Sequence, residues 1–132
     1  MSSLKSALPA RLLADGGVAA LVGDRVHWTK VPQSSGRPHV RLQVISDPRP
    51  EHLKDYHAAR VTRVQADVMA DRSTEVEAIT EAIIAALAQP ASVGGVKFGR
   101  TKAEGPRDLG EESPDGFIHR ASMDLLVEHS LA

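Results

Sequence analysis

The residues best suited to chemistry lie in a polar, proline-bearing segment, residues 47–59. His52 and His57 are five positions apart there, with Glu51 and Asp55 close by. Imidazole nitrogens and carboxylate oxygens at such short spacing could chelate a divalent cation. Because such short patterns often match by chance, a solvated polar loop explains them more simply. We therefore expect no metal site, and keep a small metal-binding domain as an alternative. The remaining histidines are dispersed: His27, His39, His119 and His129.

Nothing in the sequence has the spacing of a catalytic site. There is no cysteine, which excludes a thiol nucleophile, a thiolate zinc site and a disulfide framework. No Gly-x-Ser-x-Gly nucleophile turn occurs, and the glycines of residues 93–96 lead into a predicted strand, not into a phosphate-binding helix. Glu111 and Glu112 fit a solubilising charge run better than an acid/base pair. We expect a protein that is not an enzyme, with no catalytic residues and no cofactor.

Arginines are scattered over the polar faces of the predicted strands and the adjoining loops. Asp67 and Asp124 fall on the same type of face and could pair with them across neighbouring strands. The same arginines could instead meet acidic groups of another subunit, and the sequence leaves both possibilities open. The arginines concerned are Arg37, Arg41, Arg49, Arg60, Arg63 and Arg120.

The strongest pattern that could position these side chains lies in residues 61–70. Apolar and polar residues alternate there, which predicts a strand with one buried face. Val64 and Val68 fall on the apolar side, and Arg63, Gln65 and Asp67 on the polar side. An aspartate at position 68 would place an unpaired charge in the core, so we expect Val68→Asp to abolish folding.

A helix is predicted directly after this strand. Apolar residues recur at steps of three and four between Val76 and Leu87, as on one stripe of a helix. Thr74 and Glu77 have the spacing of a capping box at its start, and Pro90 would prevent it from continuing. A strand followed closely by an amphipathic helix predicts that the two bury their apolar sides against each other.

The rest of the chain predicts a small α+β domain. Helices are expected at residues 3–13 and 17–22, the second capped by Asp15, with strands at 25–28, 39–46, 96–101 and 117–127. Residues 91–95 read as a turn. We predict a single domain over residues 1–132, with a mostly antiparallel sheet of about four strands, helices packed on one face, and flexible loops at about 47–59 and 102–116.

The composition of the chain limits the kinds of molecule that this protein is expected to bind. The chain has 132 residues and a formal net charge of −1, so no overall basic field attracts nucleic acid. No apolar run approaches the roughly 18 residues of a membrane span, and the first residues lack a hydrophobic signal core. We therefore expect no membrane partner. An adaptor domain acting through the long polar loops is a further alternative.

The order of segments resembles a known family. The segments VAALVGDRV, VPQ, RPHV and RVQADV follow one another, and a helix with Glu75, Ile79 and Leu87 and a closing strand come after them. This succession, covering residues 4–127, is similar to that of the tail terminator, or tail-completion, proteins of long-tailed bacteriophages, prophages and gene transfer agents. Each segment is short, and their order and spacing together carry the resemblance.

The resemblance implies a structural role in a virion or phage-like particle, assembled in the cytoplasm of a bacterial host. Such proteins form a ring, usually a hexamer, that caps the head-proximal end of the tail tube and stops tube polymerisation. The expected partners are other copies of this chain, the tail tube protein and the head–tail connector or stopper protein. DNA would pass transiently through the lumen without sequence reading.

A ring made by rotation needs two different, complementary patches on each subunit. The polar segment 47–59 and the polar strand faces are the candidates here. The predicted interface residues are Arg49, Glu51, Lys54, Asp55, Tyr56, Arg63, Gln65 and Asp67.

Overall fold

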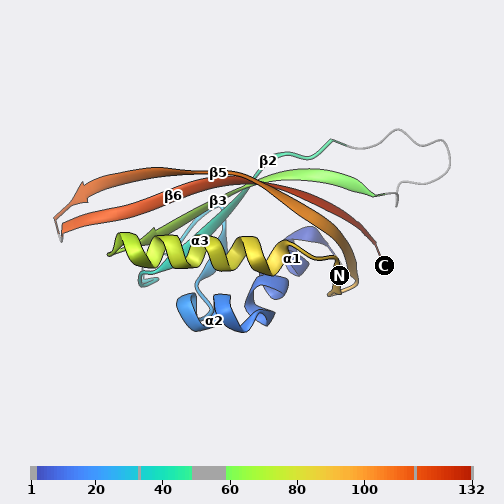
Figure 1. The fold of residues 1–132 in the computed structure, drawn as a ribbon, viewed down its shortest axis with the longest axis horizontal. Coiled ribbons are helices and arrows are strands. Elements are labelled where there is room, and N and C mark those ends of the chain that lie inside the picture. Colours follow the sequence, from blue (N-terminus) through green and yellow to red (C-terminus); the bar gives the residue numbers. More distant parts are fainter. Residues whose placement is uncertain (1–2, 33, 49–58, 115, 132) are drawn as a thin grey trace.

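The computed structural model describes residues 3–32, 34–48, 59–114 and 116–131. A long, curved sheet forms one layer, and the helices α1, α2 and α3 lie along one side of it (Figure 1). Half of the described residues are in strands and 28% are in helices. The chain ends labelled N and C lie near the same end of the sheet, and the turn between the last two strands lies at the other.

The two N-terminal helices follow the sequence prediction closely. Helix α1 spans Leu4–Ala14 and begins at a capping box formed by Ser3 and Ser6. Asp15 accepts hydrogen bonds from the backbone of Gly17 and Val18, and so caps α2, Gly16–Val22. Because the cap also ends α1, the chain turns sharply between the two helices.

Helix α3, Ser73–Leu87, packs against β3, β5 and β6 and contacts both N-terminal helices. Its predicted capping box is wrong. The helix begins at Ser73, one residue before Thr74, and its N-cap is Arg72, which makes no side-chain cap hydrogen bond. Glu75 in the first turn complements the helix dipole instead.

Six strands form the sheet, in the order β1-β2-β3-β6-β5-β4. Only β1 and β2 pair in parallel, and all other neighbouring strands are antiparallel. The bounds are Val26–Trp28 for β1, His39–Ser46 for β2, Arg60–Ala70 for β3, Ala91–Val93 for β4, Val96–Ser113 for β5 and Gly116–Leu131 for β6.

The predicted fold class is wrong, because the molecule is mostly a mixed, curled sheet of six strands. Most of the difference comes from residues 102–116, which the sequence predicted to be a loop. Through Ser113 they belong to β5, which pairs with β6 as far as Ser113 opposite Gly116. Residues 91–95 hold the short strand β4 and a turn at Gly94 and Gly95, whose φ values of 60° and 78° suit a two-residue hairpin.

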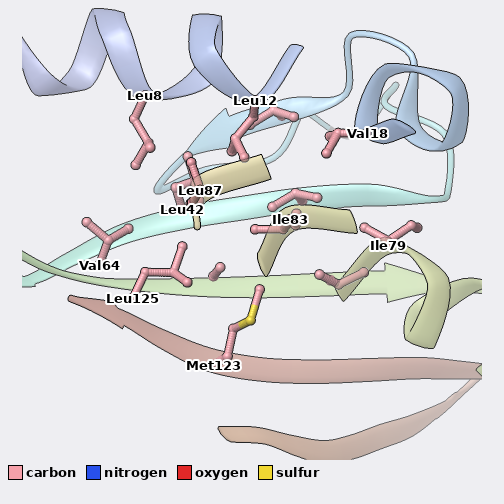
Figure 2. Packing of buried hydrophobic residues seen from close by; sticks show 14 of the residues in the cluster. Leu8, Leu12, Val18, Leu42, Val64, Ile79, Ile83, Leu87, Met123 and Leu125 are labelled. Atoms are coloured by element: carbon pink, nitrogen blue, oxygen red, sulfur yellow. The ribbon is translucent and has the colours of Figure 1, made fainter. Parts of the chain in front are cut away.

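The core lies between the helices and the near face of the sheet. Alternate residues of β3 and β6 meet the apolar stripe of α3 there, as the alternation in residues 61–70 predicted. Figure 2 shows this packing and labels Leu8, Leu12, Val18, Leu42, Val64, Ile79, Ile83, Leu87, Met123 and Leu125. All ten have exposed fractions of 1% or less, so the subunit has its own continuous core.

A buried cation joins α1 to the end of α3. The guanidinium group of Arg11 donates from Nη2 to the carbonyl oxygens of Ala86, at 3.4 Å, and Gln89. It also stacks over the ring of Phe98, 4.9 Å from the ring centroid. Burial lowers the pKa of Arg11. A cation at this place satisfies carbonyls that the helix end leaves without partners.

Candidate assembly surface

The face of the sheet that points away from the helices is held together by ion pairs within the subunit. Arg63, Gln65 and Asp67 lie on this face of β3, as the alternation predicted. Asp67 is nevertheless fully buried, with an exposed fraction of 0%. Neighbouring strands supply arginines that cover it, because Arg41 of β2 lies opposite Asp67 and Arg120 of β6 lies two residue pairs along, on the same face.

Three side chains donate to the Asp67 carboxylate. Arg41 binds Oδ2 through Nη2 at 2.6 Å and Nε at 3.2 Å. Arg120 donates from Nη2 to Oδ1 at 3.0 Å, and Gln65 donates from Nε2 to both oxygens at 3.2 and 3.3 Å. Burial raises the pKa of Asp67, but these hydrogen bonds, with that from Arg41 the largest, outweigh it and hold the pKa below its ordinary value.

A second cluster of charges crosses the same face. Arg63 donates from Nη1 to Asp124 of β6 at 2.8 Å and to Glu104 of β5 at 3.2 Å. Hydrogen bonds to Asp124 and Glu104 raise the pKa of Arg63. Of the two readings that the sequence left open for the strand arginines, pairing within the subunit is the one observed for Arg41, Arg63 and Arg120.

The predicted interface residues therefore have different environments. The side chain of Arg63 keeps 32% exposure and Gln65 is half-buried, whereas Asp67 cannot reach a neighbour without losing its own partners. The interface role of all three stays a prediction. The other predicted interface residues lie outside the described part of the chain: Arg49, Glu51, Lys54, Asp55 and Tyr56.

A threonine, a histidine and an aspartate meet at the other side of β3. Thr62 Oγ1 donates to Asp47 Oδ1 at 2.8 Å and lies 2.7 Å from His129 Nε2. These residue types occur in hydrolases, but Thr62 has an exposed fraction of 0% and His129 of 5%. No substrate could reach this hydroxyl with the sheet intact. The contact instead ties β3 and β6 to the segment that follows β2.

The metal-binding alternative depends on residues that the structure does not describe, because His52 and His57 lie in residues 49–58. Within the described ranges, no group of three or more histidine and acidic side chains is placed to hold a metal ion.

Exposed large apolar side chains occur at both ends of the sheet. Within the described residues there are four: Ile45 at 47%, Val61 at 45%, Leu109 at 44% and Phe117 at 46% exposure. Ile45 is near the end of β2 and Val61 near the start of β3, at the end of the sheet where the termini lie, here called the termini end. Leu109 and Phe117 lie on the β5–β6 hairpin at the opposite end, the hairpin end.

The hairpin end contains a groove. A cavity of about 570 Å³ lies between the first half of α3 and the outer part of the hairpin, with Val76, Ala121 and Phe117 among its lining residues. The ring of Phe117 crosses β5 at Gly110, where a Cβ atom would lie 2.3 Å from the ring. Glycine is therefore needed for this close approach.

The sequence missed this groove. Phe117 begins the strand predicted at residues 117–127, and it shares the apolar face of β6 with Ala121 and Met123. However, β3 ends at Ala70, opposite His119, so neither β3 nor the core reaches Phe117. The available signal was an aromatic residue immediately after a glycine-bearing turn, which does not show whether the ring is covered.

Comparison with known proteins decides the family. The model of a family described as tail completion protein gp17 matches residues 6–127, nearly the whole chain. The chain belongs to the tail completion protein gp17 family. The resemblance predicted from the order of segments is thus confirmed, and this tail completion protein is a structural component of a phage-type tail.

The fold is also found among solved structures. A chain of the virion of a native gene transfer agent particle superposes with a TM-score of 0.62 and 19% sequence identity, over 98% of this chain and 94% of that one. At this identity the likeness establishes the fold alone. A search of curated proteins gives no match. In the described residues, no helix combines the length and apolar character needed to cross a membrane.

Proposed function

We propose that this tail completion protein is a ring-forming tail terminator. It caps the head-proximal end of the tail tube, stops tube polymerisation and joins the tail to the head connector, and DNA passes through the lumen. Its partners are other copies of the same chain, the tail tube protein and the connector or stopper protein. Membership of the family is the evidence for a structural role in a tail. The surface of the subunit is the evidence that supports a ring.

The observation behind the ring is the placement of exposed apolar side chains at two different ends of one elongated sheet. A subunit with two different apolar patches can form heterologous contacts, in which one patch binds the other patch of the next subunit. Such contacts close into a ring when the rotation from one subunit to the next brings the last subunit back to the first. The outer face between the ends is occupied by internal ion pairs around Asp67 and Arg63, so it offers less apolar surface to a neighbour. By analogy with the family, about six copies close the ring.

The low net charge of −1 supports passage of DNA without tight binding. Proteins that hold DNA do so mainly by neutralising phosphates with lysine and arginine. A conduit with nearly balanced charge would let the duplex move through.

A tube-assembly reaction tests this function. The purified tail tube protein of the same particle is polymerised with and without this protein, and tube length is measured by electron microscopy. We expect short tubes with additional density at one end only. Tubes of unchanged length, or tubes decorated along their sides, would contradict a terminator.

A further inference from the structure

The two ends of the sheet differ in charge as well as in position. At the hairpin end, α3 contains glutamates and no lysine or arginine. Glu77 and Glu81 are exposed and line the groove together with Asp108 of β5. Glu112 lies on the same face of β5 as Asp108, closer to the turn, and Glu111 lies on the opposite face. Among the described residues, the exposed cations near this end are Arg72, Arg107 and Arg37, the last paired with Asp71. They are outnumbered by the acids, and Arg120 is held by Asp67.

The termini end carries the opposite charge. Lys97, Arg100 and Lys102 are all exposed along the first half of β5, within six residues of one another. Glu128 of β6 is an exposed acid nearby, and its carboxylate lies against Gly99. Arg60 is already paired with Asp47 at 3.1 Å. Among the residues that the structure describes at this end, the exposed cations of β5 therefore dominate.

Protection of an edge strand does not explain this arrangement. Beyond its short pairing with β4, β5 has no described partner on its second edge, and charges on such an edge prevent unwanted pairing of sheets. Either sign of charge would serve that purpose anywhere along the strand. Here cations occupy residues 97–102 and most of the charges in residues 104–112 are acidic, so the strand has one basic end and one acidic end.

We propose that the groove at the hairpin end of one subunit receives the cationic first half of β5 from the next copy of this chain. The inference rests on the proposed ring, and it names the contact that builds it. Glu77, Glu81 and Asp108 face the lysines and arginine of the neighbour, while Phe117, with an exposed fraction of 46%, supplies apolar surface. The contact is heterologous, because each subunit uses its acidic end once and its basic end once.

Charge reversal on either side tests this contact. One variant carries Glu77→Lys and Glu81→Lys, and the other carries Lys97→Glu and Arg100→Glu. All four side chains are exposed, so circular dichroism and thermal melting should show a folded subunit in each case. Alone, each variant places like charges opposite each other. We expect the concentration needed for half-assembly to rise by at least about tenfold.

Mixing the two variants is the decisive step. In an equimolar mixture the new lysines of one variant meet the new glutamates of the other, and the native glutamates meet the native cations. Rings should reappear, with the two variants alternating, which native mass spectrometry detects as equal numbers of each subunit. Contacts of the wild-type protein should also weaken as salt rises, because ions screen exposed charges.

The controls separate this inference from the proposed function. Asp24→Lys and Lys30→Glu reverse exposed charges outside both surfaces and should leave assembly unchanged. If the wild-type protein forms rings and both double variants also form them, the groove contact is wrong and the ring survives. Loss of assembly that the mixture fails to restore also overturns the contact. If the wild-type protein forms no ring at all, the proposed function itself fails.

Discussion

Val68 and Asp67 are adjacent on β3, and both have an exposed fraction of 0%, but for different reasons. Val68 points into the core beneath the sheet. Asp67 points to the opposite face and is covered by the arginines that bind it. At the scale of single residues, the alternation of a strand therefore separates an apolar interior from a layer of ion pairs.

Val68→Asp is expected to prevent folding, because the new carboxylate would be buried with no partner. The cost of such a charge, several kcal/mol, is comparable to the whole stability of a domain. Circular dichroism and amide exchange would show the loss of structure. Val61→Asp, on the same strand but 45% exposed, is the matched control and should fold. A folded, soluble Val68→Asp subunit would show that the core is placed wrongly.

Asp67 should make stability depend on pH in the acid range. Its pKa is lower in the folded protein than its ordinary value of 3.8, so the unfolded chain binds the proton more tightly. The stability that the charged carboxylate contributes is present above pH 3.8 and is lost as the pH falls through the folded pKa. Denaturant unfolding of the wild type and of Asp67→Asn measures this contribution.

We expect the wild type to be the more stable of the two above pH 3.8, and the difference in unfolding free energy to shrink below it. Both proteins share every other titrating group, so their difference isolates Asp67. A difference that stays constant from neutral to acid pH would mean that the arginines do not stabilise the charged form.

At the scale of elements, the position of α3 depends partly on Arg11, whose guanidinium group binds the carbonyl oxygens at the helix end. Arg11→Met keeps an unbranched chain but removes the charge and these hydrogen bonds. We expect a loss of about 2 kcal/mol in unfolding free energy, the usual range for hydrogen bonds made by charged groups. Lys5→Met removes a cation from an exposed site of the same helix and should cost much less. Equal effects would argue against a specific role for Arg11.

Elements with one apolar side could be predicted from the sequence, and those without one could not. The strand at residues 60–70 and the helix after it bury regular stripes, and Asp15 caps α2 as its residue type suggests. The outer half of β5 has polar residues on both faces and no core beneath it. Backbone pairing with β6 holds it in place, and that pairing leaves no periodic signal in the sequence.

The candidate assembly surface also has one part that could be predicted from the sequence and one part that could not. Pairing of Arg63 with Asp124 could be foreseen, because both residues fall on the polar faces of strands. The groove at the hairpin end could not, since it depends on where β3 stops relative to β6 and on how α3 crosses the hairpin.

At the scale of the whole molecule, the subunit is an elongated curved sheet whose exposed apolar side chains gather at two unlike ends. A single sheet and a single continuous core connect the two ends, so their distance and relative orientation are fixed. A fixed relation between two complementary ends favours closure at a defined number of subunits, because each contact repeats the same rotation.

The mass of the assembled protein tests this account most directly. Native mass spectrometry across a range of protein concentrations and at low salt should show a single closed assembly of about six subunits of 14.1 kDa, with few intermediates. A monomer at every concentration would contradict the ring. So would a ladder of masses without a preferred size, because unlike ends that do not close would form open chains.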